Sequence, residues 1–264
     1  MSSCDKIVVI GAGNMATRLA LSLQASGYRI VQVFSRTLQS AEELALHLGN
    51  GVTYTNHADQ IVTDAQLYIF SVSDNALSNL ITQIPYNDAL WIHTAGSVPA
   101  DIFANKCNRY GVLYPMQTVN KDRETNWNEV PIFIEASNED DTLLLENMAQ
   151  SISERVMLCN SQQRQALHLA AVFACNFTNH MYAIAEKLLR EQGLDFDVMK
   201  LLIRETEQKA EVMSPIKGQT GPAVRNDYNV MNKHISLLND TAESELYRLI
   251  SQNIIKYNTQ NNHS

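Results

Sequence analysis

A glycine-rich stretch near the start of the chain is the first candidate for chemistry. The residues Gly-Ala-Gly-Asn-Met-Ala at positions 11–16 directly follow an apolar run at 6–10 and open a segment with helical periodicity. In this G-x-G-x-x-A spacing, Gly11 allows a tight strand-to-helix turn, and Gly13 lets the backbone approach a pyrophosphate. The N–H groups and the dipole of the helix start attract phosphates. The pattern predicts dinucleotide binding through Gly11, Gly13, Asn14 and Met15, with an ordinary glycine turn as the alternative.

The residues at the end of the second apolar run indicate which dinucleotide binds. An NAD site carries Asp or Glu at this point, where the carboxylate binds the ribose 2′-hydroxyl. This chain has Ser35, Arg36 and Thr37 there, and the next acid is Glu42, inside the following helical pattern. Arg36 can stack on the adenine or pair with a 2′-phosphate, while the two hydroxyls supply further donors. The sequence therefore predicts NADP(H) as the cofactor, with a solvated Arg36 at the helix start as the alternative.

Short polar segments follow the next two apolar runs. Ser71, Val72 and Ser73 come at the end of the run 67–71, and Thr94 and Ala95 follow the run 90–93. Ligands of open α/β sheets bind beyond the carboxyl ends of the strands. We therefore expect both segments to border the nicotinamide half of the cofactor, with residues 114–118 as a third wall.

Two titratable residues accompany these segments. Asp74 is expected to be the N-cap of a helix rather than a catalytic acid, because short acidic side chains bind the first free N–H groups of helices. His93 is expected to pack beneath the cofactor rather than to transfer a proton. Both are therefore expected to be structural residues.

The second half of the chain holds the polar candidates for catalysis and substrate binding. His168, Asn176, Asn179 and His180 interrupt an otherwise apolar helical stretch. Asn176 and His180 share a face because they are four residues apart, and His168 lies about two turns earlier. One cleft can therefore be lined by all of them. Because buried polar groups need partners, a satisfied role in the core or in a dimer interface is the alternative.

A second polar cluster follows a Thr-Gly-Pro turn at residues 220–222. Arg225 can clamp a substrate carboxylate, and His234 can act as a general acid or base. The alternative is a loop brace between Arg225 and Asp227, with Asp227 as the N-cap of the next helix. Arg225 and His234 thus join His168 and Asn176 as catalytic candidates.

Two kinds of structure must position these residues. Short apolar runs alternate with helical patterns in the first half of the chain, which is typical of a parallel sheet covered on both faces. The sequence predicts an α/β fold, with a doubly wound Rossmann NAD(P)-binding domain at residues 1–158. The expected strands are 6–10, 29–34, 67–71, 90–93, 111–114, 130–135 and 154–158, and the expected helices are 15–25, 40–48, 75–84, 100–109 and 140–151.

An all-helical domain is expected at residues 159–264. Its helical patterns cover 160–193, 196–213, 227–238 and 240–257, and the polar tail 258–264 is expected to be disordered. The stretch 167–177 is apolar nearly all round, which is typical of a helix buried on most faces. We expect this domain to form a homodimer, and we expect the substrate in the cleft between the two domains.

Composition narrows the classes of function. The 264 residues are 45% hydrophobic and 18% charged, an ordinary globular mixture. Lys and Arg total 20 against 28 Asp and Glu, and the net charge of −8 disfavours nucleic-acid and anionic-membrane partners. The four cysteines are scattered, no metal site is expected, and no stretch is long and apolar enough to span a membrane. Because a signal-peptide pattern is also absent, we expect a cytoplasmic protein. Since nucleic acids and membranes are disfavoured as partners, we expect a small-molecule substrate.

Four motifs together resemble a known family. They are Gly-Ala-Gly-Asn-Met-Ala at 11–16, Ser-Arg-Thr at 35–37, His-Thr-Ala-Gly-Ser at 93–97 and Pro-Met-Gln-Thr at 115–118. They resemble the Rossmann half of NADP-dependent oxidoreductases whose helical second domain, of unknown function, is related to the C-terminal domain of 6-phosphogluconate dehydrogenase. These proteins are also similar to pyrroline-5-carboxylate reductase, ketopantoate reductase and the deazaflavin-dependent NADP reductase. The Thr-Gly-Pro, Arg225, Asp227 and His234 pattern resembles the second domain of the family, and the resemblance extends to about residue 238.

One departure from related enzymes bears on the chemistry. Related β-hydroxyacid dehydrogenases carry a proton-donating Lys four residues before an Asn, whereas this chain has Val172 at that spacing from Asn176. Imine reduction needs less from the protein, because the substrate can arrive already protonated. The resemblance thus implies an NADPH-dependent reductase of a small imine or keto acid. The alternatives are a non-catalytic NADP(H)-binding sensor or scaffold, and a dimerisation module with a vestigial Rossmann half.

Overall fold

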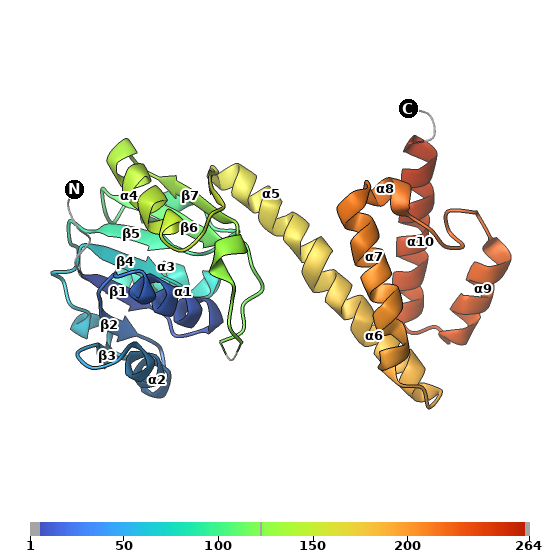
Figure 1. Ribbon diagram of the computed structural model, residues 1–264, viewed down its shortest axis with the longest axis horizontal. Helices are drawn as coiled ribbons and strands as arrows, with labels where there is room; N and C mark the ends of the chain where they lie inside the picture. The colour runs from blue at the N-terminus through green and yellow to red at the C-terminus, as the bar shows by residue number, and fades with distance from the viewer. Residues whose placement is uncertain (1–5, 122, 262–264) are drawn as a thin grey trace. The chain divides into compact units, whose positions relative to one another are not determined.

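The computed structural model describes residues 6–121 and 123–261 (Figure 1). Cys4, one of the four cysteines, lies outside the described residues. The chain divides into two compact units, Met1–Ala174 and Cys175–Ser264. The expected domain boundary between residues 158 and 159 lies earlier, just before helix α5 (Ser161–Ala171), and it stays a prediction.

Within the described residues, the first unit is built on an eight-stranded sheet with the order β3-β2-β1-β4-β5-β6-β7-β8. Strand β7 runs antiparallel to β6, and the other neighbouring pairs are parallel. The order reverses at β1, as in a Rossmann sheet, and confirms the predicted doubly wound α/β fold. The strands are β1 (Ile7–Ile10), β2 (Ile30–Phe34), β3 (Thr53–Thr55), β4 (Leu67–Phe70), β5 (Leu90–His93), β6 (Tyr110–Pro115), β7 (Ile132–Ala136) and β8 (Val156–Leu158).

Helices cover both faces of this sheet (Figure 1). Alternate residues of a strand point to opposite faces, so Ile7 and Val8 of β1 belong to two different buried clusters. The first cluster includes side chains from α1 (Asn14–Ala25), α2 (Leu38–Leu48) and α4 (Glu139–Gln150), and the second includes side chains from α3 (Asp74–Gln83) and the 3-10 turn η2 (Ala100–Phe103). Because both faces are buried, the central strands are apolar throughout.

Three local expectations differ from the structure. The edge strand β3 was not predicted, because Thr53 and Tyr54 are exposed and give no apolar run. The expected helix at 100–109 is wrong: only η2 forms, and the N–H groups of Ala104 and Lys106 bond the carbonyl three residues back, which is 3-10 rather than α-helical pairing. The tail was expected to be disordered from residue 258, whereas α10 (Ala242–Asn261) continues through residue 261.

The second unit is helical, as predicted. Its elements are α6 (Thr178–Glu191), the 3-10 turn η5 (Phe196–Met199), α7 (Lys200–Val212), α8 (Pro215–Gly218), α9 (Tyr228–Leu237) and α10. Gly193 ends the α6 region with a φ of 71°, the left-handed conformation expected after a helix. Among the described residues of this unit, only Ala223, Met231 and Ser244 are buried.

A π-helical segment, η4 (Val172–Phe177), links α5 to α6 and contains the division between the two units. Its hydrogen bonds span one residue more than those of an α-helix, so side chains on either side of it do not keep the four-residue spacing assumed from the sequence. The stretch 167–177 was expected to be buried on most faces, but Leu169, Phe173 and Phe177 are exposed. The expected burial is therefore wrong for these three side chains.

Candidate active site

The turn between β1 and α1 requires glycine at residue 11. Gly11 has a φ of 120°, and a Cβ added there would lie 2.1 Å from the carbonyl oxygen of Ser71. The Gly11 N–H donates to the Phe34 carbonyl at 2.8 Å, and the Ser71 N–H donates to the Ile10 carbonyl at 2.7 Å. The ends of β1, β2 and β4 therefore meet at this turn, where the strand order reverses.

The start of helix α1 is open in front of this turn. Gly13 is its N-cap residue, no side chain caps the helix, and its first turn carries no acid. A Cβ at Gly13 would meet no atom within 4 Å, so the space beside it is unfilled by the described residues. Asn14 borders the same space and accepts a hydrogen bond from the Lys121 N–H at 3.3 Å. Uncapped N–H groups beside an open space fit the phosphates of a dinucleotide.

The carboxyl end of β2 presents the Ser-Arg-Thr segment. The Ser35 N–H is bonded to the Thr55 carbonyl at 3.2 Å, which holds the segment beside β3. Arg36 is exposed, and Thr37 is the N-cap residue of α2, whose first turn carries no acid. The Thr37 hydroxyl donates to Ser40 Oγ at 2.8 Å rather than capping the helix. A guanidinium next to an uncapped helix start is a suitable arrangement for a phosphate.

The ends of β4 and β5 are tied together. The Thr94 hydroxyl donates to Ser71 Oγ at 3.0 Å, and Val72 lies against Gly11. Ser73, not Asp74, is the N-cap residue of α3, so the expected capping role of Asp74 is wrong. Asp74 is the first residue of that helix, and its carboxylate accepts a hydrogen bond from the Ser97 hydroxyl. The predicted cofactor-binding residues thus converge on one edge of the sheet.

His93 is fully buried beneath this edge. Its Nδ1 accepts from the Ala95 N–H at 3.1 Å, so its Nε2–H donates to the Pro99 carbonyl at 3.3 Å. Burial, with a smaller contribution from the charge of Arg164, lowers the pKa of His93 to about 4. His93 is therefore neutral at pH 7 and packs against Phe103, in agreement with the expected structural role.

Helix α5 runs alongside the segment 96–100 in the opposite direction. Ser161 Oγ accepts from the Ala100 N–H at 3.0 Å, and Arg164 Nη2 donates to the Val98 carbonyl at 2.6 Å. One residue further along the helix, Gln165 Nε2 donates to the Ser97 carbonyl at 3.0 Å. Later residues of α5 thus contact earlier residues of the segment 96–100. The contacts therefore approach the carboxyl end of β5 along the helix.

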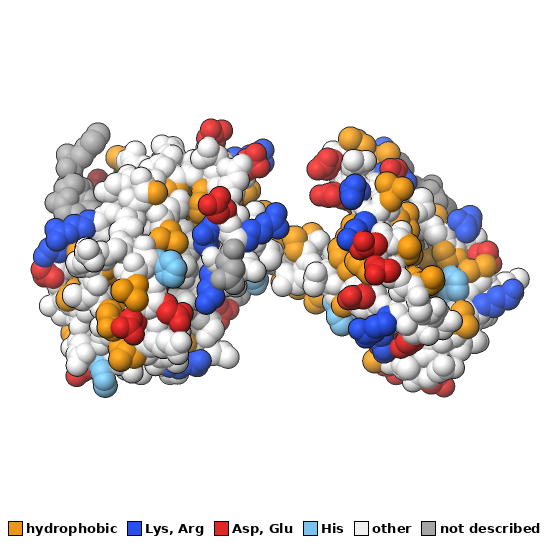
Figure 2. Space-filling view, turned by 60° about the horizontal axis from the view of Figure 1, so that its bottom comes forward, with side chains coloured by type: hydrophobic (Ala, Val, Ile, Leu, Met, Phe, Trp, Pro, Cys, Tyr) orange, Lys and Arg blue, Asp and Glu red, His pale blue; other side chains and the backbone are white. Residues whose placement is uncertain are grey.

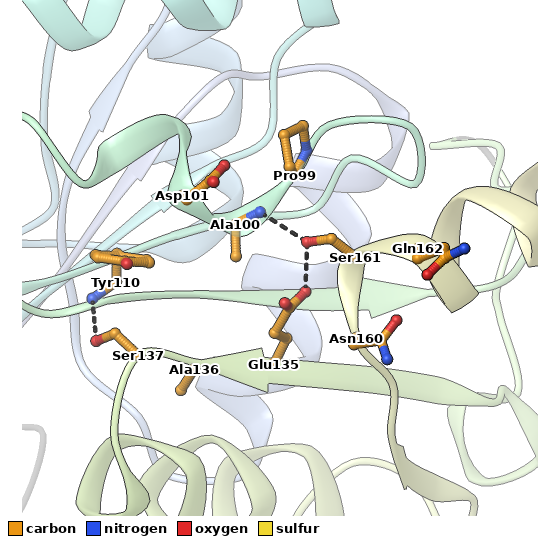
Figure 3. A pocket seen from close by; sticks show the side chains of 10 residues that line it. All are labelled: Pro99, Ala100, Asp101, Tyr110, Glu135, Ala136, Ser137, Asn160, Ser161 and Gln162. Atoms are coloured by element: carbon orange, nitrogen blue, oxygen red, sulfur yellow. Dashed lines mark hydrogen bonds between the residues drawn. The ribbon is translucent and has the colours of Figure 1, made fainter.

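A buried ion pair fixes the base of this helix. Arg164 is completely buried and pairs with Glu135 of β7, whose Oε2 also accepts from Ser161 Oγ at 2.8 Å. Figure 3 shows Glu135, Ser161 and Ala100 joined in this way. They border a pocket of about 370 Å³ at the amino end of β6. Because β6 is parallel to β5, this pocket lies at the edge of the sheet opposite to the predicted cofactor site.

His168 lies at the other end of the same series of contacts. Its ring packs on Gly96, where an added Cβ would be 2.7 Å from Nδ1 and 2.9 Å from Cβ of His168. Its Nδ1 is 3.3 Å from the hydroxyl of Tyr114, and the two rings meet edge-on with centroids 6.2 Å apart. Helix α5 therefore brings His168 to Gly96, the residue that follows Thr94 and Ala95 in the loop predicted to border the nicotinamide.

The other catalytic candidates belong to the second unit. Asn176 lies in η4, and Arg225 lies in the loop before α9; both are exposed. Asp227 caps α9 through a bond from the Val230 N–H at 3.2 Å, as the alternative reading expected. His234 is exposed on α9, and its Nδ1 is 2.9 Å from the hydroxyl of Tyr247 on α10.

Two features of the site escaped sequence reasoning. The sequence places Tyr114 only in the expected third wall of the cofactor site, although the structure makes it the partner of His168. Arg164 was not singled out, although a spacing of four residues places it and His168 on one face of a helix. An arginine among the first residues of an apolar helix was the available signal, because a buried arginine requires an acidic partner.

Among the residues that the structure describes, no group of three or more His, Cys, Asp or Glu side chains could hold a metal ion. Within residues 6–121 and 123–261, no helix combines the length and apolar character needed to cross a membrane.

Two family models match the chain. Residues 6–94 match the family described as NADP oxidoreductase, coenzyme F420-dependent, and residues 130–254 match a domain of unknown function, DUF2520. The first match contains the glycine-rich turn and the ends of β2, β4 and β5. The second contains the catalytic candidates His168, Asn176, Arg225 and His234.

Solved structures extend the likeness over nearly the whole chain. A candidate NADP oxidoreductase from Bacteroides fragilis is 46% identical, with a TM-score of 0.87, over 96% of this chain and 98% of that one. A reductive aminase from Aspergillus terreus in complex with NADPH and ethyl levulinate is 15% identical, with a TM-score of 0.74, over 96% and 95% of the two chains. A pyrroline-5-carboxylate reductase from Coxiella burnetii is 17% identical, with a TM-score of 0.57, over 98% of both. At these lower identities the likeness is one of fold alone.

Among curated proteins, a glutamyl-tRNA reductase from Methanothermobacter marburgensis is 33% identical over 66 residues. That match spans 25% of this chain and only 17% of the curated protein, so it concerns a local segment. The Bacteroides fragilis protein, in contrast, is matched over nearly its full length at 46% identity. This chain therefore belongs to the same family of NADP oxidoreductases.

Proposed function

We propose that the protein is an NADPH-dependent reductase of a small imine or keto acid. The observation that carries this proposal is the fit at the end of β1. There, the turn at Gly11 leaves no room for a side chain, and the start of α1 is left uncapped beside an open space. Such a helix start suits the pyrophosphate of a dinucleotide.

The proposed cofactor contacts follow the edge of the sheet from β2 to β5. Gly11, Gly13, Asn14 and Met15 would hold the pyrophosphate at the start of α1. Ser35, Arg36 and Thr37 would bind the 2′-phosphate and the adenine side, because Arg36 is exposed next to the uncapped start of α2. Ser71, Val72, Ser73, Thr94 and Ala95 would line the nicotinamide half. NADPH supplies a hydride when it is bound there.

The proton for the reduction is assigned to His168. Reduction of a C=O group, or of a C=N group that arrives unprotonated, adds one hydride to carbon and one proton to oxygen or nitrogen, so for these substrates the protein must hold a proton beside the heteroatom. His168 is partly exposed and packs on Gly96, directly after the predicted nicotinamide loop. The reductive aminase and pyrroline-5-carboxylate reductase folds support an imine as the substrate class.

The second unit would supply further substrate contacts. Arg225 is exposed and can bind a substrate carboxylate through two parallel hydrogen bonds. Asn176 offers an amide for hydrogen bonding in η4, and π-helical segments occur frequently at functional sites. His234 is proposed as a second titratable group, although its Nδ1 is already engaged by Tyr247.

Calorimetric titration with NADPH and NADH tests the cofactor assignment. We expect NADPH to bind at least about tenfold more tightly than NADH, because a charged hydrogen bond to the 2′-phosphate contributes about 1.5–3 kcal/mol. Arg36→Asp should remove this preference. Arg29→Asp is the matched control, because it makes the same charge change at the amino end of β2, on the other edge of the sheet. Failure of the wild type to bind either dinucleotide would contradict the proposal.

We also propose that the protein is a homodimer whose interface includes the second unit. Figure 2 shows apolar side chains on the surface of this unit. Leu201 is 76% exposed, Val212 79% and Leu237 77%, while almost none of the unit's apolar side chains are buried. Exposed apolar side chains of this kind support an interface with another surface. We propose a second copy of this chain as the partner. It carries the same exposed apolar side chains on α7, α9 and α10, and most oligomers pair identical surfaces in this way.

A non-catalytic NADP(H) sensor is the second candidate. Val172 stands where related dehydrogenases carry a proton-donating lysine, and this favours a protein that binds the cofactor without reducing a substrate. The two candidates differ in one measurement. A sensor would bind NADPH but consume none with a panel of imines and keto acids, whereas a reductase would consume NADPH with at least one of them.

The cytoplasm is the proposed compartment. Cys107, Cys159 and Cys175 are free thiols, and such cysteines persist where glutathione and thioredoxin keep thiols reduced. Burial raises the pKa of Cys107 to about 11 and also raises that of Cys159, so both thiols are unreactive. Fractionation of the source cells would test this assignment.

A further inference from the structure

The pair formed by His168 and Tyr114 has a property that neither residue has alone. Tyr114 lies near the carboxyl end of β6 and is buried against Phe133, with its hydroxyl 3.3 Å from His168 Nδ1. Burial raises the pKa of Tyr114, so the phenol keeps its proton at neutral pH. A phenol hydroxyl can donate to a bare nitrogen or accept from an N–H. Tyr114 can therefore hold the ring of His168 in either protonation state.

The backbone fixes the same ring from the other side. The would-be Cβ of Gly96 overlaps Nδ1, Cγ and Cβ of His168, so the imidazole occupies the space beside this glycine. The ion pair of Arg164 with Glu135 and the bond from Gln165 to Ser97 hold the helix one turn earlier. Among the described residues, Nδ1 of His168 has the Tyr114 hydroxyl as its partner, and Nε2 has none. The ring is thus restrained at Nδ1 and open at Nε2.

We propose that Tyr114 is a positioning residue that keeps Nε2 of His168 as the nitrogen that gives its proton to the substrate. This inference rests on the proposed function, in which His168 supplies the proton. In the neutral ring, the Tyr114 hydroxyl donates to Nδ1, so the single ring proton resides on Nε2. In the cationic ring, Nδ1–H donates to the phenol oxygen, and Nε2 still carries a proton.

The cationic ring loses the proton on Nε2, which forms a new bond to the substrate nitrogen or oxygen as carbon receives the hydride from the cofactor. The substrate is reduced, and the cofactor is oxidised. Directly after the transfer the neutral ring keeps its proton on Nδ1, where the Tyr114 oxygen accepts it. The ring returns to its resting form by taking up a proton from water at Nε2 and losing the one on Nδ1, after which the Tyr114 hydroxyl again donates to Nδ1.

The second unit contains a similar pair that serves as a comparison. His234 Nδ1 is 2.9 Å from the Tyr247 hydroxyl, and the rings meet at 88° with centroids 5.7 Å apart. This pair joins α9 to α10, and no glycine backbone presses on its imidazole in the described residues. It offers a matched control, because Tyr247→Phe removes a tyrosine hydroxyl that contacts the Nδ1 of a histidine in a similar geometry.

Ring-nitrogen NMR of 15N-labelled protein tests the positioning directly and needs no substrate. His168→Asn identifies the signals of His168. At a pH where the ring is neutral, we expect one dominant tautomer with the proton on Nε2. In Tyr114→Phe we expect a mixture of the two tautomers, and in Gly96→Ala we expect shifted signals because the ring is displaced. Tyr247→Phe should leave the His168 signals unchanged. Unchanged His168 signals in Tyr114→Phe would overturn the proposal.

Turnover separates this proposal from the proposed function. NADPH oxidation is followed with 2-methyl-1-pyrroline as an imine probe and pyruvate as a keto-acid probe. We expect kcat to fall about 100-fold in His168→Asn and about tenfold in Tyr114→Phe, with the Kd for NADPH unchanged in both. An unchanged kcat in Tyr114→Phe, with normal NADPH binding, would overturn the role of Tyr114 alone. Loss of NADPH binding in the wild type would instead overturn the proposed function, and the NMR result would still decide whether Tyr114 positions the ring.

Discussion

The two units of this protein keep their apolar side chains in different places. All members of the three buried clusters lie in the first unit, between Ile7 and Cys159. The second unit has long helices, yet its most apolar side chains, such as Leu201 and Leu237, are mostly exposed. A helical unit cannot be stable with its apolar stripes in water. The first unit therefore encloses its apolar side chains in its own core, whereas we expect another surface to cover those of the second unit.

The ion pairs of the two units also differ in burial. In the first unit, a completely buried Arg164 pairs with Glu135 and fixes the helix that carries His168. In the second, Lys187 and Glu243 pair at the surface, with both side chains partly exposed. Buried pairs are strongly coupled to the fold because an isolated charge cannot stay buried, whereas exposed pairs contribute little. Precise positioning is thus a property of the first unit.

Gly11→Ala has the largest expected effect on the first unit. The new Cβ would lie 2.1 Å from the Ser71 carbonyl oxygen at a φ of 120°, so the turn must move away from the phosphate site. We expect the affinity for NADPH to fall about 100-fold or more, measured by calorimetry. Gly27→Ala is the matched control: its φ is 93°, but no atom lies within 4 Å of the added Cβ. Equal losses in both variants would mean that backbone strain, not the cofactor turn, is responsible.

Leu201→Glu is expected to have the largest effect on the second unit. A carboxylate placed on an apolar interface would be buried without a partner when the dimer forms. This would weaken the free energy of association by several kcal/mol. The wild type should sediment as a dimer, and the variant should shift toward the monomer mass of 29.6 kDa. Glu207→Gln, an exposed change on the same helix, should leave the mass unchanged. A monomeric wild type would refute the homodimer.

Arg164→Met sharpens the comparison of the two ion pairs. It leaves the Glu135 carboxylate, which is mostly buried, without its partner, so the free energy of unfolding should fall by about 3 kcal/mol in urea. Lys187→Met breaks the exposed pair of the second unit and should produce no measurable change. A stability loss in Lys187→Met equal to that in Arg164→Met would remove the distinction between the units.

His93 should make the stability of the first unit depend on pH. Its pKa is about 4 in the folded protein and about 6.5 in the unfolded chain, so the unfolded chain binds an additional proton between these values. The free energy of unfolding should therefore fall as the pH is lowered from 7 to 4, by at most about 3 kcal/mol from this group. His93→Asn should flatten this part of the pH profile. An identical slope in the variant would assign the effect to other groups.

The sequence predicted the parts of the first unit that local patterns control. The apolar runs and the glycine spacing identified β1, β2, β4 and β5, because buried parallel strands are apolar throughout. The same patterns could not show β3, whose threonines and tyrosine pair at an exposed edge. They also predicted too much helix at 100–109, because composition alone does not distinguish a 3-10 turn from an α-helix.

Contacts between distant segments were not predictable from those patterns. Tyr114 and His168 are 54 residues apart, and Arg164 and Glu135 are 29 apart, so only the folded sheet brings each pair together. The π-helical segment at Val172–Phe177 follows an ordinary helical composition and gave no signal. The exposure of the second unit was also missed, because apolar periodicity predicts burial without saying which chain provides the cover.

The contact of Gly96 with His168 also constrains how the protein can evolve. Any side chain at position 96 would occupy the place of the imidazole, so the glycine is required only for as long as the histidine is present. A relative that loses the histidine is released from this constraint, and a relative that gains a larger residue at 96 must give up the histidine. Positions 96 and 168 should therefore co-vary across the family, although they are distant in the gene.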